Sequence, residues 1–237
     1  MERRPVGRTP QQTRPISIEL DAQRNAKGSV IIATGGTRVL CAASVDDRVP
    51  PWMAESGQGW VTAEYRMLPG SSAQRISRGK NSRATEIQRL IGRSLRAVVD
   101  LKALAGFTIT VDCDVLDADG GTRTASISGA WVALWLACDR LVREERLAVN
   151  PVKQHLAATS VGMVEGTALL DLDYPEDSAA DVDMNVVGTS DGRLVEVQGT
   201  AEGEPFSREE LDELLSLAQQ GIAQLVEAQR GAIQTTD

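Results

Sequence analysis

Residues 111–131 read VDCDVLDADGGTRTASISGAW, and they contain a strand, a glycine turn and the start of a helix in direct succession. Apolar and polar residues alternate over 107–116, which is typical of a half-buried strand. Apolar residues then recur at helical spacing over 127–142. The first amides of such a helix have no partner within it and carry the positive end of its dipole, so this stretch predicts an anion-binding site.

The side chains of the turn suit a bound phosphate. Gly120 and Gly121 let the backbone approach a ligand closely, Thr122 can donate a hydroxyl, and the fork of Arg123 can hold two phosphate oxygens. An ordinary glycine turn beside a surface arginine would have the same sequence. Walker A and dinucleotide fingerprints are absent, so the pattern does not assign the anion to a nucleotide tail.

The rest of the chain alternates short strands with long helices. A first group of strands is expected before the turn, with a hairpin at Gly35-Gly36, and a helix from Thr85. A second group of strands and a final helix capped by Ser207 and Glu210 follow. The expected strands are 16–20, 29–34, 39–45, 59–65, 107–116, 157–164, 167–172, 182–187 and 194–198. This pattern predicts an α+β fold, and no linker divides it, so we expect a single domain over 1–237.

The net charge of −8 argues at first sight against a nucleic-acid partner, but the charge is unevenly distributed. Residues 1–100 carry 16 Lys and Arg against 9 Asp and Glu, whereas residues 101–237 carry 9 against 24. Eight basic residues of one segment are opposed only by Glu86: Arg66, Arg75, Arg78, Lys80, Arg83, Arg89, Arg93 and Arg96. The segment is either a solvated surface or a site for an anionic polymer.

A second candidate site is the acidic segment YPEDSAADVDMNVV at 174–187. Alternation along a strand would place Asp181, Asp183 and Asn185 on one face, with Asp177 just upstream. Oxygen ligands of this kind suit Mg²⁺ or Mn²⁺, and a carboxylate can also act as a general acid. Three separated cysteines and one histidine make a zinc site or a disulfide framework implausible. An acidic strand edge without function remains the alternative.

Taken together, these segments closely resemble bacterial RNase PH, the family of phosphate-dependent 3′ exoribonucleases that trim tRNA precursors. The similarity runs nearly end to end, through GSVIIATGGTRVLCAASV, GQGWVTAEYRMLP, SRATEIQRLIGRSLRAVVDLKAL, TITVDCDVLDADGGTRTASISGA, EDSAADVDMNVV and LVEVQGTAEGEPFS. The resemblance implies paired β-α units and a homo-oligomer, a hexamer built as a trimer of dimers. It also implies phosphorolysis of RNA with inorganic phosphate, release of nucleoside diphosphates, and the reverse nucleotidyltransferase reaction.

The resemblance also implies roles for individual residues. Arg83, Gly121, Thr122 and Arg123 match the family's phosphate-binding positions. Two carboxylates, Asp177 and Asp183, match its catalytic and metal-binding positions; Asp183 is the preferred proton donor for the leaving oxygen, and Asp181 has no assigned role. The loop with Arg75 and Arg78 matches the region that holds RNA. The expected cofactor is Mg²⁺ or Mn²⁺, with inorganic phosphate as co-substrate.

The expected partner is RNA with a free 3′ end, chiefly tRNA precursors with rRNA as a further substrate. Few aromatic residues are available for base stacking, so binding should depend on backbone charge and on salt concentration. No apolar run approaches the length of a membrane span, and the N-terminus lacks an apolar signal segment, so a cytoplasmic location is expected.

The sequence departs from the family pattern at two places. The loop between Pro69 and Arg83 is several residues shorter than is usual, which puts substrate preference in doubt more than chemistry. Ala84 also stands where threonine is common. Two other functions are weighed against phosphorolysis: a non-catalytic RNA-binding ring subunit of an exosome-like assembly, and a small-molecule phosphotransferase. The complete set of matching positions argues against the first, and the lack of an ATP fingerprint argues against the second.

Overall fold

The first sheet forms from the strands expected in the first half of the chain. A computed structural model describes residues 4, 7–79 and 81–234. The strand order is β1-β2-β3-β5-β4, with antiparallel pairs throughout except β4 beside β5, which is parallel. Gly35 turns the β2–β3 hairpin with a φ of 57°. The strands are β1 (Ile16–Leu20), β2 (Gly28–Thr34), β3 (Thr37–Asp46), β4 (Trp60–Met67) and β5 (Thr108–Asp117).

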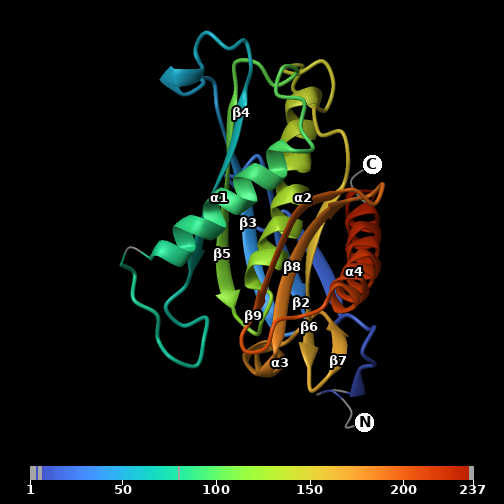
Figure 1. Cartoon of the computed structure of the whole chain (residues 1–237). Helices are drawn as coiled ribbons and strands as arrows, with labels where there is room; N and C mark the ends of the chain where they lie inside the picture. The colour runs from blue at the N-terminus through green and yellow to red at the C-terminus, as the bar shows by residue number, and fades with distance from the viewer. Residues whose placement is uncertain (1–3, 5–6, 80, 235–237) are drawn as a thin grey trace.

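Two helices pack on one face of this sheet, α1 (Ser82–Arg96) and α2 (Thr122–Arg143) (Figure 1). Helix α1 begins three residues before the expected Thr85, because the Asn81 side chain accepts hydrogen bonds from the amides of Arg83 and Ala84 and so caps an earlier turn. Ala84 is buried in that first turn, and the cap comes from Asn81. The departure from threonine at position 84 therefore leaves the helix start capped.

The second sheet has the order β7-β6-β8-β9 and is antiparallel throughout. Its strands are β6 (Leu156–Val164), β7 (Thr167–Leu170), β8 (Val182–Thr189) and β9 (Leu194–Ala201). Helix α4 (Arg208–Gln234) covers β6, β7 and β8. Its start confirms the expected capping box, since the Glu210 carboxylate accepts from the Ser207 amide at 2.6 Å. The α+β fold is thus confirmed.

A short helix, α3 (Tyr174–Ala179), was not expected from the sequence. It is too short to show a helical period in the sequence. Proline is tolerated in the first helical turn, where its missing amide hydrogen is not needed. A capping box between Asp173 and Glu176 closes the start of the helix. The expected irregular segment around Asp177 is therefore helical.

Helix α2 lies between the two sheets and joins them. It contacts β2, β3 and β5 on one side and β6 on the other. Trp131 is 1% exposed, which confirms a core role for that residue. The Gln229 side chain of α4 donates to the carbonyls of Ser128 in α2 and Leu156 in β6, at 3.0 and 2.9 Å. The two sheets therefore share one central helix.

By length and mean hydropathy, α2 is also the one helix among the described residues that could cross a membrane. Serine, threonine and arginine interrupt its apolar residues, so the sequence contains no continuous apolar run of that length here. In the folded chain 72% of its apolar window is buried against the sheets. This is the burial expected of a core helix.

Candidate active site

The glycine turn between β5 and α2 has a left-handed backbone that glycine adopts readily. Gly120 and Gly121 have φ values of 73° and 65°, and Gly121 is the N-cap of α2. A Cβ atom on Gly120 would lie 2.6 Å from the carbonyl oxygen of Leu172. Only glycine fits both constraints. The turn brings the end of β5, the start of α2 and the segment before α3 into contact, at the lower end of the molecule in Figure 1.

Thr122 and Arg123 are the first two residues of α2. The Tyr65 hydroxyl of β4 donates to the Thr122 hydroxyl at 2.9 Å, and Arg123 Nη1 donates to Gln198 Oε1 of β9 at 2.6 Å. The Arg123 side chain is 17% exposed. A largely buried arginine at a helix N-terminus combines a fixed charge with free backbone amides, and such a pair binds phosphate well.

Arg83, at the start of α1, faces the same site. Burial raises the pKa of Tyr65, and the hydrogen bond to Thr122 and the charges of Arg83 and Arg123 partly oppose this rise. Both guanidinium groups therefore lie within electrostatic reach of one phenol. The structure thus brings together all four predicted phosphate-binding residues around Tyr65 and the turn, which are Arg83, Gly121, Thr122 and Arg123.

The two predicted carboxylates lie on neighbouring elements of the second half, Asp177 on α3 and Asp183 on β8. Partial burial and the nearby charge of Asp183 raise the pKa of Asp177, whereas Arg83 and Arg123 lower it. The Asp177 carboxylate therefore lies within electrostatic reach of Asp183 and of both arginines. Segments that are far apart in the sequence thus bring positive and negative groups to one site.

Asp181 directly precedes β8 and is exposed, while Asp183 and Asn185 are half-buried on one face of that strand. The backbone amide of Asp181 donates to the Met163 carbonyl at 2.8 Å, next to the start of β8. The strand itself therefore carries two of the three polar side chains expected on one face.

Asp177 and Asp183 are the candidate metal ligands of this site. Across residues 4, 7–79 and 81–234, no three His, Cys, Asp or Glu side chains lie together in a way that would hold a metal ion. Mg²⁺ is commonly held by one or two carboxylates together with water and substrate phosphates. Asp177 and Asp183 fit that pattern, with the remaining ligands coming from outside the protein.

The basic loop, residues 68–81, borders a pocket of about 380 Å³ next to Arg83. Arg78 lines the pocket, Arg75 is exposed in the same loop, and Lys80 lies outside the described residues. Other members of the basic segment have structural roles. Arg93 donates to Glu196, and Arg96 packs 4.2 Å over the Trp60 ring. The basic segment therefore divides into arginines at the pocket and arginines that stabilise the fold.

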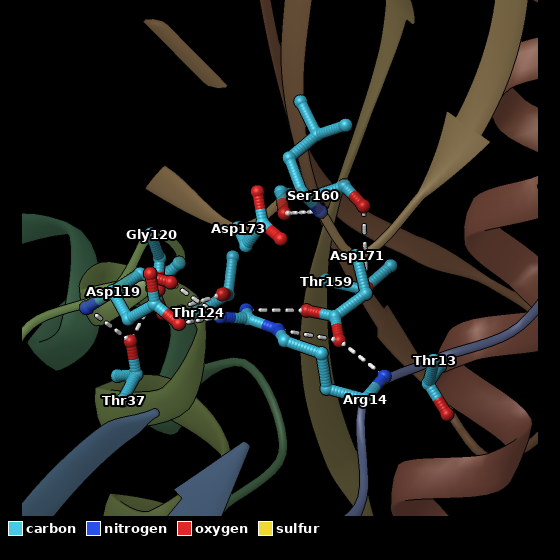
Figure 2. A network of polar contacts seen from close by, with 12 residues as sticks. Thr13, Arg14, Thr37, Asp119, Gly120, Thr124, Thr159, Ser160, Asp171 and Asp173 are labelled. Carbon is cyan, nitrogen blue, oxygen red and sulfur yellow. Dashed lines mark hydrogen bonds and ion pairs between the residues drawn. The ribbon is translucent and has the colours of Figure 1, made fainter. Parts of the chain in front are cut away.

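Sequence analysis missed a buried polar network behind the site. Arg14, with a side chain 5% exposed, binds Asp171 before α3 and the carbonyl of Asp119 in the glycine turn (Figure 2). Arg4 and Arg8 reach Glu176 in α3. The only signal in the sequence was a run of arginines in a segment of low hydrophobicity, which equally suits a solvated tail.

Comparisons with known proteins match both halves of the chain. Family models described as "3′ exoribonuclease family, domain 1" and "domain 2" match residues 12–138 and 156–221. The chain belongs to the 3′ exoribonuclease family. A curated relative named Ribonuclease PH, from Parasynechococcus marenigrum, is 54% identical over 98% of this chain and 95% of its own length. The resemblance to RNase PH is confirmed.

Solved structures of the same fold are more distant in sequence. One is an Archaeoglobus fulgidus exosome with RNA bound to the active site, with a TM-score of 0.83, 23% identity and coverage of 95% of this chain and 92% of that one. Rice Rrp46 has a TM-score of 0.79, 18% identity and coverage of 95% and 97%. At such identities these structures establish the fold.

Proposed function

We infer that this chain is an enzyme that shortens RNA from its 3′ end by phosphorolysis, with inorganic phosphate as co-substrate and nucleoside diphosphates as products. Family membership and the 54% identical relative named Ribonuclease PH support this function. One structural observation supports its assignment to particular residues: the glycine turn before α2 packs against the start of α3, the helix that carries Asp177. A phosphorolytic site needs a place for the nucleophile beside a place for the scissile phosphate.

The phosphate would be held by Arg83, Gly121, Thr122 and Arg123. Two guanidinium groups and the helix N-terminus would neutralise its charge and fix its oxygen toward the terminal phosphodiester. Attack forms a new phosphorus–oxygen bond and breaks the bond to the 3′ oxygen of the preceding nucleotide. The leaving nucleotide thereby becomes a nucleoside diphosphate, and the shortened RNA keeps a free 3′ hydroxyl.

Asp177 and Asp183 would serve the other side of the reaction. We assign proton transfer to the leaving 3′ oxygen to Asp183, and a divalent metal ion to the pair. When bound, Mg²⁺ or Mn²⁺ would offset charge on the scissile phosphate. Run backward, the same groups add nucleotides from diphosphates to an RNA end.

Arg75 and Arg78 would guide the RNA strand toward the pocket. The expected substrates are tRNA precursors, with rRNA as a further substrate, and the expected location of the enzyme is the cytoplasm.

The expected assembly is a hexameric ring of this chain, and we propose that the two halves fold as one unit around α2. Sedimentation of the purified protein at micromolar concentration checks the assembly: a hexamer mass is expected, and a monomer would contradict it.

The test of the function is an incubation with a 3′-tailed RNA and Mg²⁺, with and without inorganic phosphate. Released nucleotides are separated by charge. Diphosphates that appear only with phosphate are expected. Monophosphates would indicate hydrolysis, and no release with retained RNA binding would favour the non-catalytic ring subunit.

A further inference from the structure

Arg14 is a buried charged residue that has no part in the proposed mechanism. Its guanidinium binds Asp171 twice, with Nε donating to Oδ2 at 3.0 Å and Nη2 to Oδ1 at 2.7 Å. The Arg14 amide donates to the same carboxylate at 2.7 Å. This pair is buried, with side chains 5% and 9% exposed. A buried arginine held from three points by one carboxylate has a single fixed position.

The same guanidinium also rests against the glycine turn. Arg14 Nη1 donates to the Asp119 carbonyl, and a Cβ atom on Gly121 would lie 3.1 Å from Arg14 Nη2. Thr37 completes the support, because its hydroxyl donates to the Gly120 carbonyl at 2.6 Å and accepts from the Asp119 amide at 2.8 Å. Figure 2 shows these groups around the turn, with the Arg14 side chain reaching from Asp171 toward Asp119.

Asp171 lies directly before the segment that leads into α3, the helix with Asp177. Its own amide donates to the Ser160 carbonyl at 2.7 Å, and the Leu172 amide donates to the Ser160 hydroxyl at 3.1 Å. The Tyr174 amide in α3 lies 3.4 Å from Asp119 Oδ1 of the turn. The turn therefore contacts the start of α3 directly, and Arg14 and Asp171 join the two from behind.

We propose that Arg14 is a positioning residue that sets the phosphate-binding turn and the Asp177 helix at their working separation. It touches neither phosphate nor RNA. It acts by fixing the Asp119 carbonyl, and with it the start of α2, relative to Asp171 and α3. This inference rests on the proposed assignment of the phosphate site to Gly121, Thr122 and Arg123.

A neighbouring arginine provides a matched comparison. Arg4 makes an equally buried pair with Glu176, with Nε at 2.5 Å from Oε1 and Nη2 at 2.6 Å from Oε2. Its remaining bonds go to carbonyls of its own segment and of Leu170 and Asp171. None of the Arg4 contacts given by the structure involves the glycine turn. Substitution of Arg4 therefore removes a buried contact to α3 but leaves the contacts of the glycine turn intact.

The experiment compares Arg14→Met with Arg4→Met in the assembled enzyme. Arg14→Met removes the guanidinium partner of the buried Asp171 carboxylate, whereas Arg4→Met leaves Glu176 paired with Arg8 at 3.1 Å, so the loss of thermal stability should be larger for Arg14→Met. Steady-state rates are measured well below both melting temperatures, at varied inorganic phosphate and saturating RNA. Arg14→Met should raise the KM for phosphate about tenfold and lower kcat, because small displacements in a site cost much of the rate. Arg4→Met should lower kcat with an unchanged KM for phosphate.

Two milder variants keep the test decisive if Arg14→Met does not fold. Asp171 has a φ of 55°, which asparagine tolerates, so Asp171→Asn removes the charge at little backbone cost. It should raise the KM for phosphate in the same direction by a smaller factor. Arg14→Lys keeps the positive charge but lacks the forked guanidinium group. Compared with Arg14→Met, it should therefore recover more of the thermal stability than of the phosphate affinity.

An unchanged KM for phosphate in both Arg14→Met and Asp171→Asn would overturn the proposal, and so would an equal rise in Arg4→Met. Arg123→Ala, run in parallel, separates this failure from failure of the proposed site. If Arg123→Ala also leaves the KM and kcat unchanged, the phosphate site itself is misplaced. If only Arg123→Ala responds, the site holds and Arg14 has a purely structural role.

Discussion

The glycine turn and the basic loop both present arginines to the same pocket region, but they are built differently. The turn, residues 118–123, is held by Thr37, by Arg14 and by close packing against Leu172. The basic loop, residues 68–81, has exposed Arg75 and Arg78, and its bonds are mostly local, such as that from Ser72 Oγ to the Gln74 carbonyl.

This difference follows from what each region must bind. A nucleophile works only when its attacking oxygen is held in line with the scissile bond, so its binding groups need a rigid frame. An RNA backbone repeats the same charge along its length, so exposed arginines on a loop can bind it at any of several successive phosphates. A turn held by buried contacts and an exposed loop with mostly local bonds therefore suit the two proposed ligands.

Arg123→Ala should have the largest effect, because it removes a fixed charge from the rigid frame. We expect a loss of about 10²- to 10³-fold in phosphate-dependent turnover, the size seen when one preorganised donor is removed. Turnover is measured as release of nucleoside diphosphates, and folding by circular dichroism. Arg140→Ala, at the other end of α2 and paired with Glu144 at 3.4 Å, is the control and should stay near the native rate. Native turnover in Arg123→Ala would contradict the assigned role.

Gly120→Ala tests the rigidity of the turn. The φ of 73° costs an alanine about 1–2 kcal/mol, and the contact of 2.6 Å with the Leu172 carbonyl adds to that cost. Gly166→Ala is the matched control, with a φ of 71° and open space around its Cβ. Chemical denaturation should show a clearly larger loss for Gly120→Ala, together with lower turnover. Equal losses of unfolding free energy in Gly120→Ala and Gly166→Ala would contradict a rigidly held turn.

Arg78→Ala and Arg75→Ala probe the loop and should have smaller effects. Each should raise the KM for RNA by up to about tenfold and lower the slope of log affinity against log salt by about one. The KM for phosphate should stay constant, because the loop reaches the turn through the Ser71 carbonyl, which accepts from the Ala118 amide at 2.7 Å, and not through Arg75 or Arg78. Arg208→Ala, whose side chain pairs with Asp212 at 3.0 Å on α4, controls for loss of an exposed charge. A changed KM for phosphate would break the distinction between the two regions.

Substitution of His155 should have the smallest effect, which is on the pH dependence of stability. Burial lowers its pKa, and the ring stacks on Trp131 with centroids 4.3 Å apart. The unfolded chain therefore binds a proton more readily than the folded chain, and stability declines as pH falls through the unfolded value of about 6.5. The thermal midpoint of His155→Gln should fall less than that of the native protein between pH 7.5 and 5.5. Parallel declines would contradict a buried neutral histidine.

The sequence predicted the long elements well, because they are periodic and bury one face. The alternation over 107–116 and the glycine turn each specify local structure, and both are found in the fold. The site residues of the turn were also accessible to sequence reasoning, since glycine, threonine and arginine at a helix start have a direct physical meaning. Their proximity to Asp177 and Asp183 depends on the packing of two sheets around α2, which no local pattern encodes.

The residues that escaped prediction are those whose meaning is non-local. Arg14 pairs with a carboxylate 157 positions away, and Arg4 with one 172 positions away. In the sequence they are arginines in a polar N-terminal segment, and exposure would explain them equally well. Helix α3 was missed for a related reason: six residues with a proline show no period, and the capping box that stabilises them is visible only once Asp173 and Glu176 are placed.

The central claim is that inorganic phosphate is the nucleophile. The most direct measurement supplies radiolabelled inorganic phosphate with unlabelled 3′-tailed RNA and follows the label. Phosphorolysis predicts that the label appears as the β-phosphate of released nucleoside diphosphates, at one label per nucleotide removed. RNA shortening with unlabelled monophosphate products would contradict the account.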